Sequence, residues 1–252
     1  MAVINLKAEK ELAFDSPDHI MPWGTRHDNS RNRRFNSKIY SLHSHLKTLK
    51  ILDIGCAGGG FVADCLNDGH IAVGLEGSDW SRKYQRAEWA HIPQFLFTCD
   101  VTRNFDLYDE KGNRIMFDFV TAWEMLEHIK EADISGVITN IKKHLLPTGL
   151  LIVSISTGPD IINGVNLHQT TQPRSFWVKK FAEHEFIPMQ THLRYFNGQF
   201  IREASHGDEN FHLVLSCAPD QAPAIPKTKT ADYLFDKWHG SKWQKLIYKL
   251  IS

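Results

Sequence analysis

The 252-residue chain is poor in cysteine and has no long apolar run. No stretch approaches the roughly 20 apolar residues that a bilayer-spanning helix needs. The four cysteines form neither a CxxC pair nor a metal-ligand spacing, so we expect free thiols instead of a disulfide framework. They are Cys56, Cys65, Cys99 and Cys217. The first residues include Lys7 and Lys10 where a secretory signal would be apolar. These absences predict a cytoplasmic protein with no membrane partner.

The chain also lacks an excess of either charge. Its 29 Lys and Arg residues equal its 29 Asp and Glu residues. A neutral total argues against a nucleic-acid partner, which would call for a basic surface. The length suits one α/β domain with additions at its ends.

Short apolar runs alternate with stretches of helical spacing along the middle of the chain. The predicted strands cover residues 50–54, 71–75, 95–97, 117–122 and 150–155, and the predicted helices cover 35–49, 61–66, 81–90, 132–146 and 175–184. Strands that alternate with helices indicate βαβ units and a parallel sheet. Two further apolar runs, 191–196 and 211–217, have no helical stretch between them. We therefore expect them to pair as an antiparallel hairpin at the end of the sheet.

Three parts of the chain follow from this pattern. Residues 1–36 are polar and irregular, but their mixture of Trp, His, Asp and Arg favours a lid or substrate segment over a plain tail. Residues 37–218 form the core. Residues 219–252 contain a linker and a predicted amphipathic helix with a basic face. Such a helix can lie on a membrane surface, but packing on its own domain or in a homodimer is the favoured interpretation.

A glycine-rich turn follows the first strand of the core. Gly55, Gly58, Gly59 and Gly60 stand between strand 50–54 and a helix. Without a Cβ, glycine lets a ligand lie against the backbone, and the helix that follows offers free N–H groups. The spacing is G-x-x-G-x-G, whereas dinucleotide folds use G-x-G-x-x-G. A purely structural turn remains the alternative on this evidence.

Acidic residues end the next two predicted strands. Glu76 can accept hydrogen bonds from ribose hydroxyls, and Asp100 can accept one from an adenine amino group. A glycine turn, a Glu and an Asp at successive strand ends together predict a nucleoside site.

Three motifs resemble those of class I S-adenosylmethionine (SAM) dependent methyltransferases. Residues 52–59 resemble the first motif, residues 117–128 the fourth, and residues 146–153 the turn and strand after it. The resemblance covers residues 48–217. It implies an α/β fold with a doubly wound, mostly parallel seven-stranded sheet and an antiparallel last strand. It also implies that SAM is the cofactor, with its methionine part at Gly55, its ribose at Glu76 and its adenine at Asp100.

The predicted cofactor-binding residues lie at the ends of the strands that carry these motifs. They are Asp53, Gly55, Cys56, Ala57, Gly58, Glu76, Gly77, Asp100, Val101, Trp123 and Glu124. The Gly77-Ser78 pair directly after Glu76 departs from the family pattern.

A second group of polar residues lies beside the expected methyl donor. Glu124, Glu127 and His128 follow the fourth strand, and His168 lies after the fifth, at the same edge of the sheet. Two carboxylates and two imidazoles can hold one divalent metal ion. The set resembles two family branches, ubiquinone-pathway O-methyltransferases and small-RNA 3′-terminal 2′-O-methyltransferases, which use a divalent metal to position hydroxyls.

A metal-free interpretation of this group is also open. Glu127 and His128 would then only hold the turn, and His128 or His168 would act as general base. The candidate catalytic residues are therefore His128, His168 and Glu124.

The sequence favours transfer of a methyl group to an oxygen of a small metabolite or sugar. The reaction would be a direct displacement, helped mainly by alignment of acceptor and methyl donor. A 2′-O-methyltransferase that acts on an RNA end is one alternative, which the neutral charge disfavours. A non-catalytic SAM-binding protein is another, which the intact turn and both acids disfavour.

Overall fold

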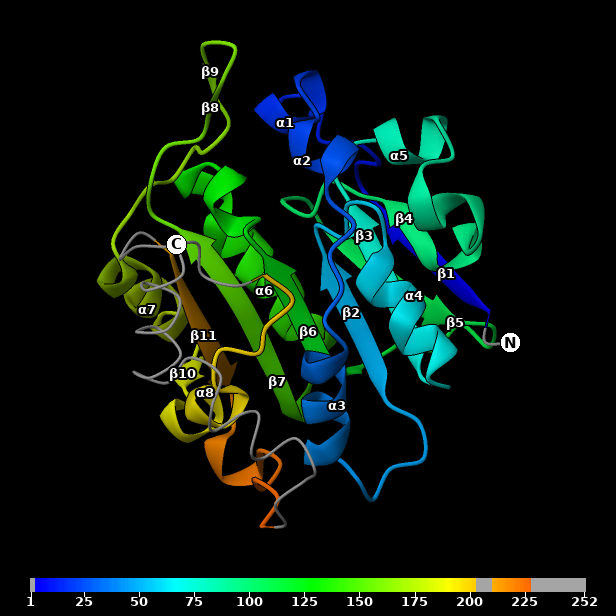
Figure 1. Cartoon of the computed structure of the whole chain (residues 1–252), viewed down its shortest axis with the longest axis vertical. Helices are drawn as coiled ribbons and strands as arrows, with labels where there is room; N and C mark the ends of the chain where they lie inside the picture. Colours follow the sequence, from blue (N-terminus) through cyan, green and yellow to red (C-terminus); the bar gives the residue numbers. More distant parts are fainter. Residues whose placement is uncertain (1–2, 203–209, 228–252) are drawn as a thin grey trace, which may run out of the picture.

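The computed structural model describes residues 3–202 and 210–227 and centres on a seven-stranded sheet (Figure 1). The strand order is β10-β11-β7-β6-β2-β3-β4. In chain order the strands are β2 (Lys50–Ile54), β3 (Ile71–Glu76), β4 (Leu96–Thr98), β6 (Phe117–Trp123), β7 (Leu145–Ser156), β10 (Ile187–Pro188) and β11 (Asn210–Ser216).

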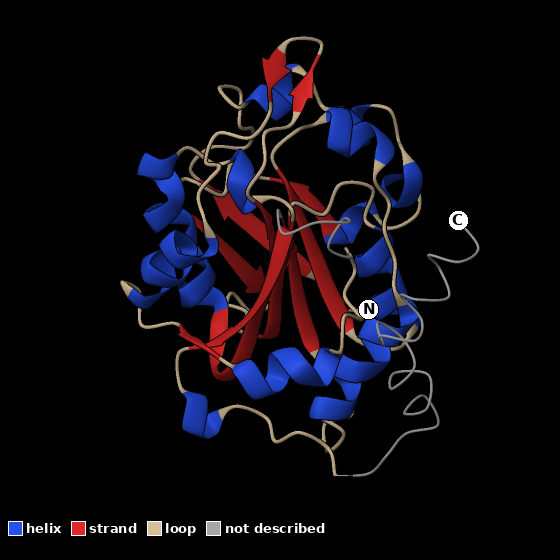
Figure 2. Ribbon diagram, turned by 60° about the vertical axis from the view of Figure 1, so that its left-hand side comes forward, coloured by secondary structure: helices blue, strands red, loops and turns tan. Residues whose placement is uncertain are grey.

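The sheet is mostly parallel, as predicted. Strand β2 pairs in parallel with β3 and β6, β3 with β4, and β6 with β7. Strand β11 is antiparallel to both of its neighbours, β7 and β10. All seven residues of β6 are buried, because helices cover both faces of the sheet (Figure 2). The doubly wound α/β fold is confirmed.

Eight α-helices belong to the described part of the chain. They are α1 (Pro17–Ile20), α2 (Trp23–His27), α3 (Arg33–Leu42), α4 (Gly60–Asn67), α5 (Trp80–Lys83), α6 (Ile134–His144), α7 (Arg174–Ala182) and α8 (Gln190–Phe196). Helices α3 and α4 lie in front of the sheet in Figure 1. The predicted helix 81–90 breaks after Lys83 because Gln85 and Ala87 both have positive φ.

The N-terminal segment is more ordered than its polar sequence predicted. Strand β1 (Ile4–Ala8) pairs antiparallel with β5 (Phe105–Asp109), a strand that the periodicity did not reveal. Helix α3 begins at Arg33, where the Asn32 side chain accepts hydrogen bonds from the N–H groups of Arg34 and Phe35. The helix expected from residue 35 therefore begins two residues earlier, at this cap, whereas the division of the chain at residue 36 stays a prediction.

The predicted strand at 191–196 was wrong. These residues belong to helix α8, in which His192 and Phe196 are buried four positions apart. This spacing is that of one helix face, and a short apolar run does not distinguish it from a strand. The antiparallel pairing at the sheet edge exists, but it joins β11 to the two-residue strand β10.

A small hairpin stands above the carboxyl edge of the sheet. Strands β8 (Ile161–Ile162) and β9 (Val165–Asn166) pair antiparallel. They are joined by Asn163 and Gly164, which both have positive φ, as a tight hairpin turn requires. Figure 1 shows this hairpin and helices α1 and α2 at the same end of the molecule.

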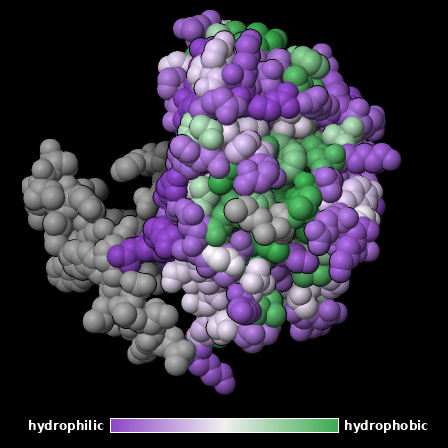
Figure 3. All heavy atoms as spheres, turned by 90° about the vertical axis from the view of Figure 1, so that its right-hand side faces the viewer, coloured by the Kyte–Doolittle hydropathy of each residue, from purple (hydrophilic) through white to green (hydrophobic). Residues whose placement is uncertain are grey.

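One expectation falls beyond the described residues. The predicted C-terminal helix at 231–251 lies there, so a homodimer through it stays a prediction. Within the described residues, none of the helices combines the length and apolar character that crossing a membrane requires. Figure 3 shows the face on the side of β1, where hydrophilic residues surround an area of hydrophobic ones.

Phe35 joins helix α3 to the rest of the core. Its ring is fully buried, and its centroid lies 5.0 Å from that of Trp123 and 5.3 Å from that of Phe196. Phe61 of α4 lies 5.6 Å away. One side chain therefore connects α3, α4, α8 and the end of β6.

We predict that Phe35→Ala lowers the free energy of unfolding by about 3–5 kcal/mol, because it leaves a cavity among these rings. Urea unfolding followed by fluorescence measures the loss. Phe14→Ala is the control, since Phe14 is 56% exposed and its removal should change stability little. Equal effects of the two substitutions would contradict this description of the core.

Candidate active site

A cavity of about 190 Å³ opens at the carboxyl ends of the parallel strands. Its wall is made by the turn after β2, the ends of β3, β4 and β6, and the N-terminal segment. The chain leaves β2 toward β3 and leaves β6 toward β7, on opposite sides of β2. Such a reversal of strand order is where open α/β sheets bind ligands.

The glycine turn after β2 is tightly packed against other parts of the chain. Gly55 has φ of +77°, and a Cβ at this position would lie 2.6 Å from Cγ of Met125. At Gly58, a Cβ would lie 2.6 Å from Oδ1 of Asn29 and 2.8 Å from the carbonyl oxygen of Asp28. Gly55 therefore makes room for Met125 at the cavity wall, whereas Gly58 makes room for the N-terminal segment.

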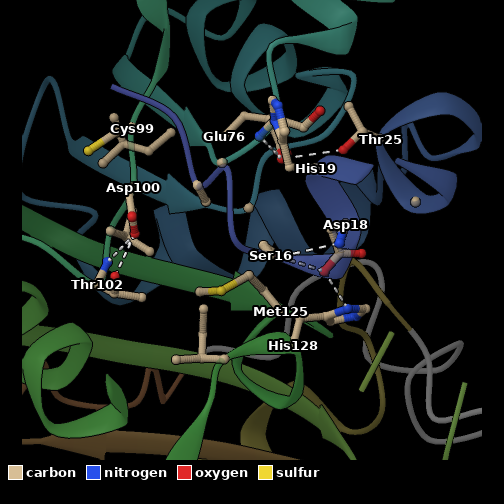
Figure 4. A pocket seen from close by; sticks show the side chains of 18 of the residues that line it. Ser16, Asp18, His19, Thr25, Glu76, Cys99, Asp100, Thr102, Met125 and His128 are labelled. Carbon is tan, nitrogen blue, oxygen red and sulfur yellow. Dashed lines mark hydrogen bonds and ion pairs between the residues drawn. The ribbon is translucent and has the colours of Figure 1, made fainter. Parts of the chain in front are cut away.

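The carboxylate of Glu76 is held inside the cavity wall. Its Oε2 accepts a hydrogen bond from the N–H of Ala57 at 2.9 Å, and its Oε1 accepts from the N–H of Ser78 at 3.2 Å. The hydroxyl of Thr25 also donates to Oε1 (Figure 4). Burial raises the pKa of Glu76. Oε2 accepts only one of these three hydrogen bonds and can still accept a second, so the group can bind a hydroxyl.

Asp100 lies at the end of the next strand. Its Oδ1 accepts hydrogen bonds from the backbone N–H and the hydroxyl of Thr102, at 3.1 and 2.6 Å. Its Oδ2 lies 3.4 Å from Nζ of Lys10. Asp100 and Glu76 both border the cavity from neighbouring strand ends, as their positions in the sequence predicted.

The predicted cofactor residues divide into two groups. Those that line the cavity are Gly55, Ala57, Glu76, Gly77, Asp100, Val101, Trp123 and Glu124. Asp53, Cys56 and Gly58 are absent from its wall. Asp53 points into the core and accepts a hydrogen bond from the hydroxyl of Thr121 at 2.6 Å, and Cys56 packs against Gly74.

The N-terminal segment adds wall residues that the motifs did not predict. Ser16, His19, Thr25 and Asp28 all line the cavity. The mixed composition of the segment favoured a lid, but it contained no signal for these particular contacts.

Arg202 closes one side of the cavity by joining two acids. Its guanidinium lies 3.2 Å from a carboxylate oxygen of Asp28 and 3.5 Å from one of Glu124. Glu124 has φ of +47°, an uncommon conformation for a residue other than glycine. Asn210 also donates a hydrogen bond to the Glu124 carboxylate, at 3.4 Å.

Three of the four predicted metal-binding residues lie together. Glu127, His128 and His168 each offer one ligand atom, and these atoms lie within 4.8 Å of one another. Glu124 is not part of this cluster, because its backbone directs the carboxylate to Arg202. The physical reason is that residues 126–128 form a 3-10 turn, so positions 124, 127 and 128 do not share an α-helix face.

Glu127 is fully buried, and only one of its two carboxylate oxygens accepts a hydrogen bond from the described residues. Its Oε1 accepts a hydrogen bond from the N–H of Ser156 at 2.8 Å, while Oε2 has no partner among the described residues. Burial raises the pKa of Glu127 to about 7. A buried carboxylate oxygen without a donor is unfavourable by itself and favourable beside a cation.

The two imidazoles meet edge to face, with ring centroids 4.6 Å apart. Nδ1 of His168 lies 2.6 Å from the carbonyl oxygen of Gly158, so Nδ1 carries the proton and Nε2 has a free lone pair. Burial lowers the pKa of His168.

The pKa of His128 is shifted in the opposite direction from that of His168. Its Nδ1 lies 2.8 Å from Oδ2 of Asp18, on helix α1 (Figure 4). Burial alone would lower the pKa of His128, but the neighbouring Asp18 carboxylate raises it to about 9.

The fold and the site together define a SAM-dependent methyltransferase. The chain matches the family of methyltransferase domains over residues 25–213 and belongs to this family. A methyltransferase structure from Clostridium acetobutylicum, 12% identical, covers 79% of this chain and 96% of its own, with a TM-score of 0.51. S-adenosylmethionine is the cofactor of the chain.

Relatives with named reactions match parts of the chain. A ubiquinone biosynthesis O-methyltransferase from Pasteurella multocida is 32% identical over 111 residues, which are 42% of this chain and 45% of that protein. The chain spans less than half the length of the curated relatives it matches. A 1,6-didemethyltoxoflavin-N1-methyltransferase structure from Burkholderia thailandensis, solved with its acceptor and S-adenosylhomocysteine, is 16% identical. The match covers 79% of this chain and 83% of that protein's chain, with a TM-score of 0.51.

We predict that Asp53 makes the fold less stable as pH rises. Burial raises its pKa to about 7, whereas the unfolded value is about 3.9. The folded state therefore binds the proton more tightly, and stability is lost between about pH 4 and pH 7. Asn cannot ionise. The free energy of unfolding of Asp53→Asn should therefore rise by about 1–2 kcal/mol relative to that of wild type between pH 5 and pH 7.

Urea unfolding of both proteins at pH 5, 6, 7 and 8 measures this difference. The gap should widen up to about pH 7 and then stay constant. A gap of the same size at every pH would show that Asp53 does not bind its proton more tightly in the folded protein.

Proposed function

We propose that the enzyme transfers the SAM methyl group to a hydroxyl oxygen of a small molecule, positioned by a divalent cation. Glu127, His128 and His168 are the proposed ligands of this cation. The observation that carries the proposal is the buried Oε2 of Glu127, which has no donor among the described residues, on a carboxylate that clusters with two imidazoles.

The strand ends supply a separate place for each part of the cofactor. Gly55 lines the cavity where the methionine part of SAM is proposed to lie, and Met125 packs where a side chain at position 55 would be. The Glu76 carboxylate is fixed by backbone N–H groups and is the proposed partner of the ribose hydroxyls. Asp100 is the proposed partner of the adenine amino group.

The ligand set favours a particular class of metal. One carboxylate and two imidazoles suit a borderline ion such as Mn²⁺, Fe²⁺ or Zn²⁺ better than Mg²⁺, which prefers oxygen ligands. When bound, such an ion lowers the pKa of a hydroxyl that it contacts. The residues of the chain then hold the acceptor oxygen and the methyl group in line, which is the main source of rate in a direct displacement.

His168 is the proposed proton acceptor if the ion is not required. Its Nδ1 donates to Gly158, so Nε2 is the basic nitrogen, and the lowered pKa keeps the ring neutral at pH 7. Glu124 has a positioning role in either case, because Arg202 and Asn210 fix its carboxylate at the cavity wall.

The named relatives support an oxygen acceptor on a small molecule. The curated relatives are O-methyltransferases of ubiquinone biosynthesis, although the match covers less than half of each. The neutral charge of the chain gives no support to an RNA acceptor. The expected cytoplasmic location stays a prediction.

The ribose assignment predicts a loss of cofactor affinity. Glu76→Ala should weaken SAM binding by about 1.5–3 kcal/mol, the usual contribution of hydrogen bonds to a charged group. Isothermal calorimetry measures the affinity, and circular dichroism checks that the variant is folded. Glu110→Ala, at an exposed acid just after β5, is the control and should bind SAM as wild type does. A folded Glu76→Ala variant with unchanged affinity would remove the ribose assignment.

The metal site predicts one bound ion per chain. Electron paramagnetic resonance should show that wild type binds Mn²⁺, and that Glu127→Gln and His168→Ala weaken binding by tenfold or more. SAM affinity should change little in both variants, because neither Glu127 nor His168 belongs to the cavity wall. Glu131→Gln, an exposed acid four residues along, is the control.

Transfer of labelled methyl groups to a panel of catechols and methyl glycosides then tests the reaction. Activity should fall on EDTA treatment and return with Mn²⁺ or Zn²⁺. Methylation that ignores EDTA, together with no Mn²⁺ binding, would refute the metal site and leave His168 as the base. In that case His168→Ala should still lose rate.

A further inference from the structure

The N-terminal segment contacts the carboxyl edge of the sheet at several separate points. Lys10 pairs with Asp100, the Thr25 hydroxyl donates to Glu76, and Asp28 pairs with Arg202. Two backbone hydrogen bonds, from Ala13 to Gly77 and from Asp100 to Lys10, fix the segment beside the same strand ends. The segment therefore packs directly on residues proposed to bind the cofactor.

One further contact reaches the cation cluster. Asp18 is the residue of this segment whose carboxylate lies 2.8 Å from Nδ1 of His128. Helix α1 holds it in place, because the Ser16 side chain caps the helix and accepts a hydrogen bond from the Asp18 N–H at 3.3 Å. The Ser16 hydroxyl also lies 3.5 Å from Oδ2 of Asp18 (Figure 4).

This contact determines which nitrogen of His128 can bind a cation. A carboxylate next to Nδ1 holds the proton on that atom and fixes the plane of the ring. A cation that displaces the remaining ring proton then binds at Nε2. His168 is arranged in the same way, since Gly158 takes its Nδ1 proton. Both imidazoles of the cluster thus have an oxygen from elsewhere in the chain within 2.8 Å of Nδ1.

We propose that Asp18 is a positioning residue that orients His128 for the cation, so that the cluster is complete only while the N-terminal segment covers the cavity. This inference rests on the proposed cation site. Asp18 touches neither the acceptor nor the cofactor in this role and acts through His128. Thr25 and Lys10, which contact the proposed cofactor-binding acids, belong to the same segment as Asp18. Packing of this segment on those acids therefore also brings Asp18 to His128.

Metal titration of the whole chain tests the role of Asp18. Asp18→Asn keeps the size of the side chain but removes its charge, and Mn²⁺ affinity should fall about 10- to 100-fold, as is usual when a partner of a metal-bound histidine is lost. Glu9→Gln removes an exposed acid of the same segment and should leave the affinity unchanged. An Asp18→Asn variant that binds Mn²⁺ as tightly as wild type overturns the proposal.

A double-substitution cycle separates positioning from a general structural effect. If Asp18 acts through His128, then adding Asp18→Asn to a His128→Ala variant should cause no further loss of Mn²⁺ affinity. A further loss as large as in the wild-type background would mean that Asp18 acts elsewhere, and would overturn the proposal.

Nuclear magnetic resonance of ¹⁵N-histidine-labelled protein without metal gives a readout independent of the cation. In wild type, the His128 Nδ1 proton should be hydrogen-bonded and slow to exchange, and Asp18→Asn should abolish this signal. The same signal in both proteins overturns the positioning role. If wild type binds no Mn²⁺ but shows the Asp18-dependent signal, the proposed cation site fails while the Asp18–His128 pair stands.

Discussion

The reversal of strand order at β2 is the constraint on which the site depends. Because β3 and β4 lie on one side of β2 and β6 and β7 on the other, the chain leaves neighbouring strand ends in opposite directions. A space is left at the carboxyl edge between the segments that leave β2 and β6, and neither segment fills it. Gly55 and Met125, which follow β2 and β6, meet across this space so closely that no side chain fits at position 55. Every residue proposed to bind SAM stands at this edge.

Burial of carboxylates is the second physical feature of the site. Asp53, Glu76 and Glu127 are almost inaccessible to water, and burial raises the pKa of each. Such groups are unfavourable unless hydrogen bonds or a cation compensate them. Asp53 and Glu76 have donors from the chain itself, whereas one oxygen of Glu127 has none among the described residues. This difference favours Glu127 over Asp53 as the proposed cation ligand.

The order of strands and helices in the core was predictable because each buried strand is a short apolar run bounded by glycine or polar residues. The rule that carboxyl ends of parallel strands meet at one edge also predicted that His168 would approach Glu127 and His128. It could not predict that Glu124 turns away, since the positive φ of Glu124 depends on contacts with Ser154 and Arg202. The contacts of Asp18 and Thr25 could not be predicted either, because a polar segment without periodicity contains no information on which distant residues it contacts.

A crystal structure of the protein with S-adenosylhomocysteine and Mn²⁺ tests the central claim most directly. The account predicts adenine at Asp100, ribose at Glu76, and an anomalous manganese peak bound by Oε2 of Glu127 and Nε2 of both His128 and His168. Adenine and ribose at these acids with no manganese among the three side chains would contradict the proposed cation site. The nucleoside bound anywhere else would contradict the account of the cavity itself.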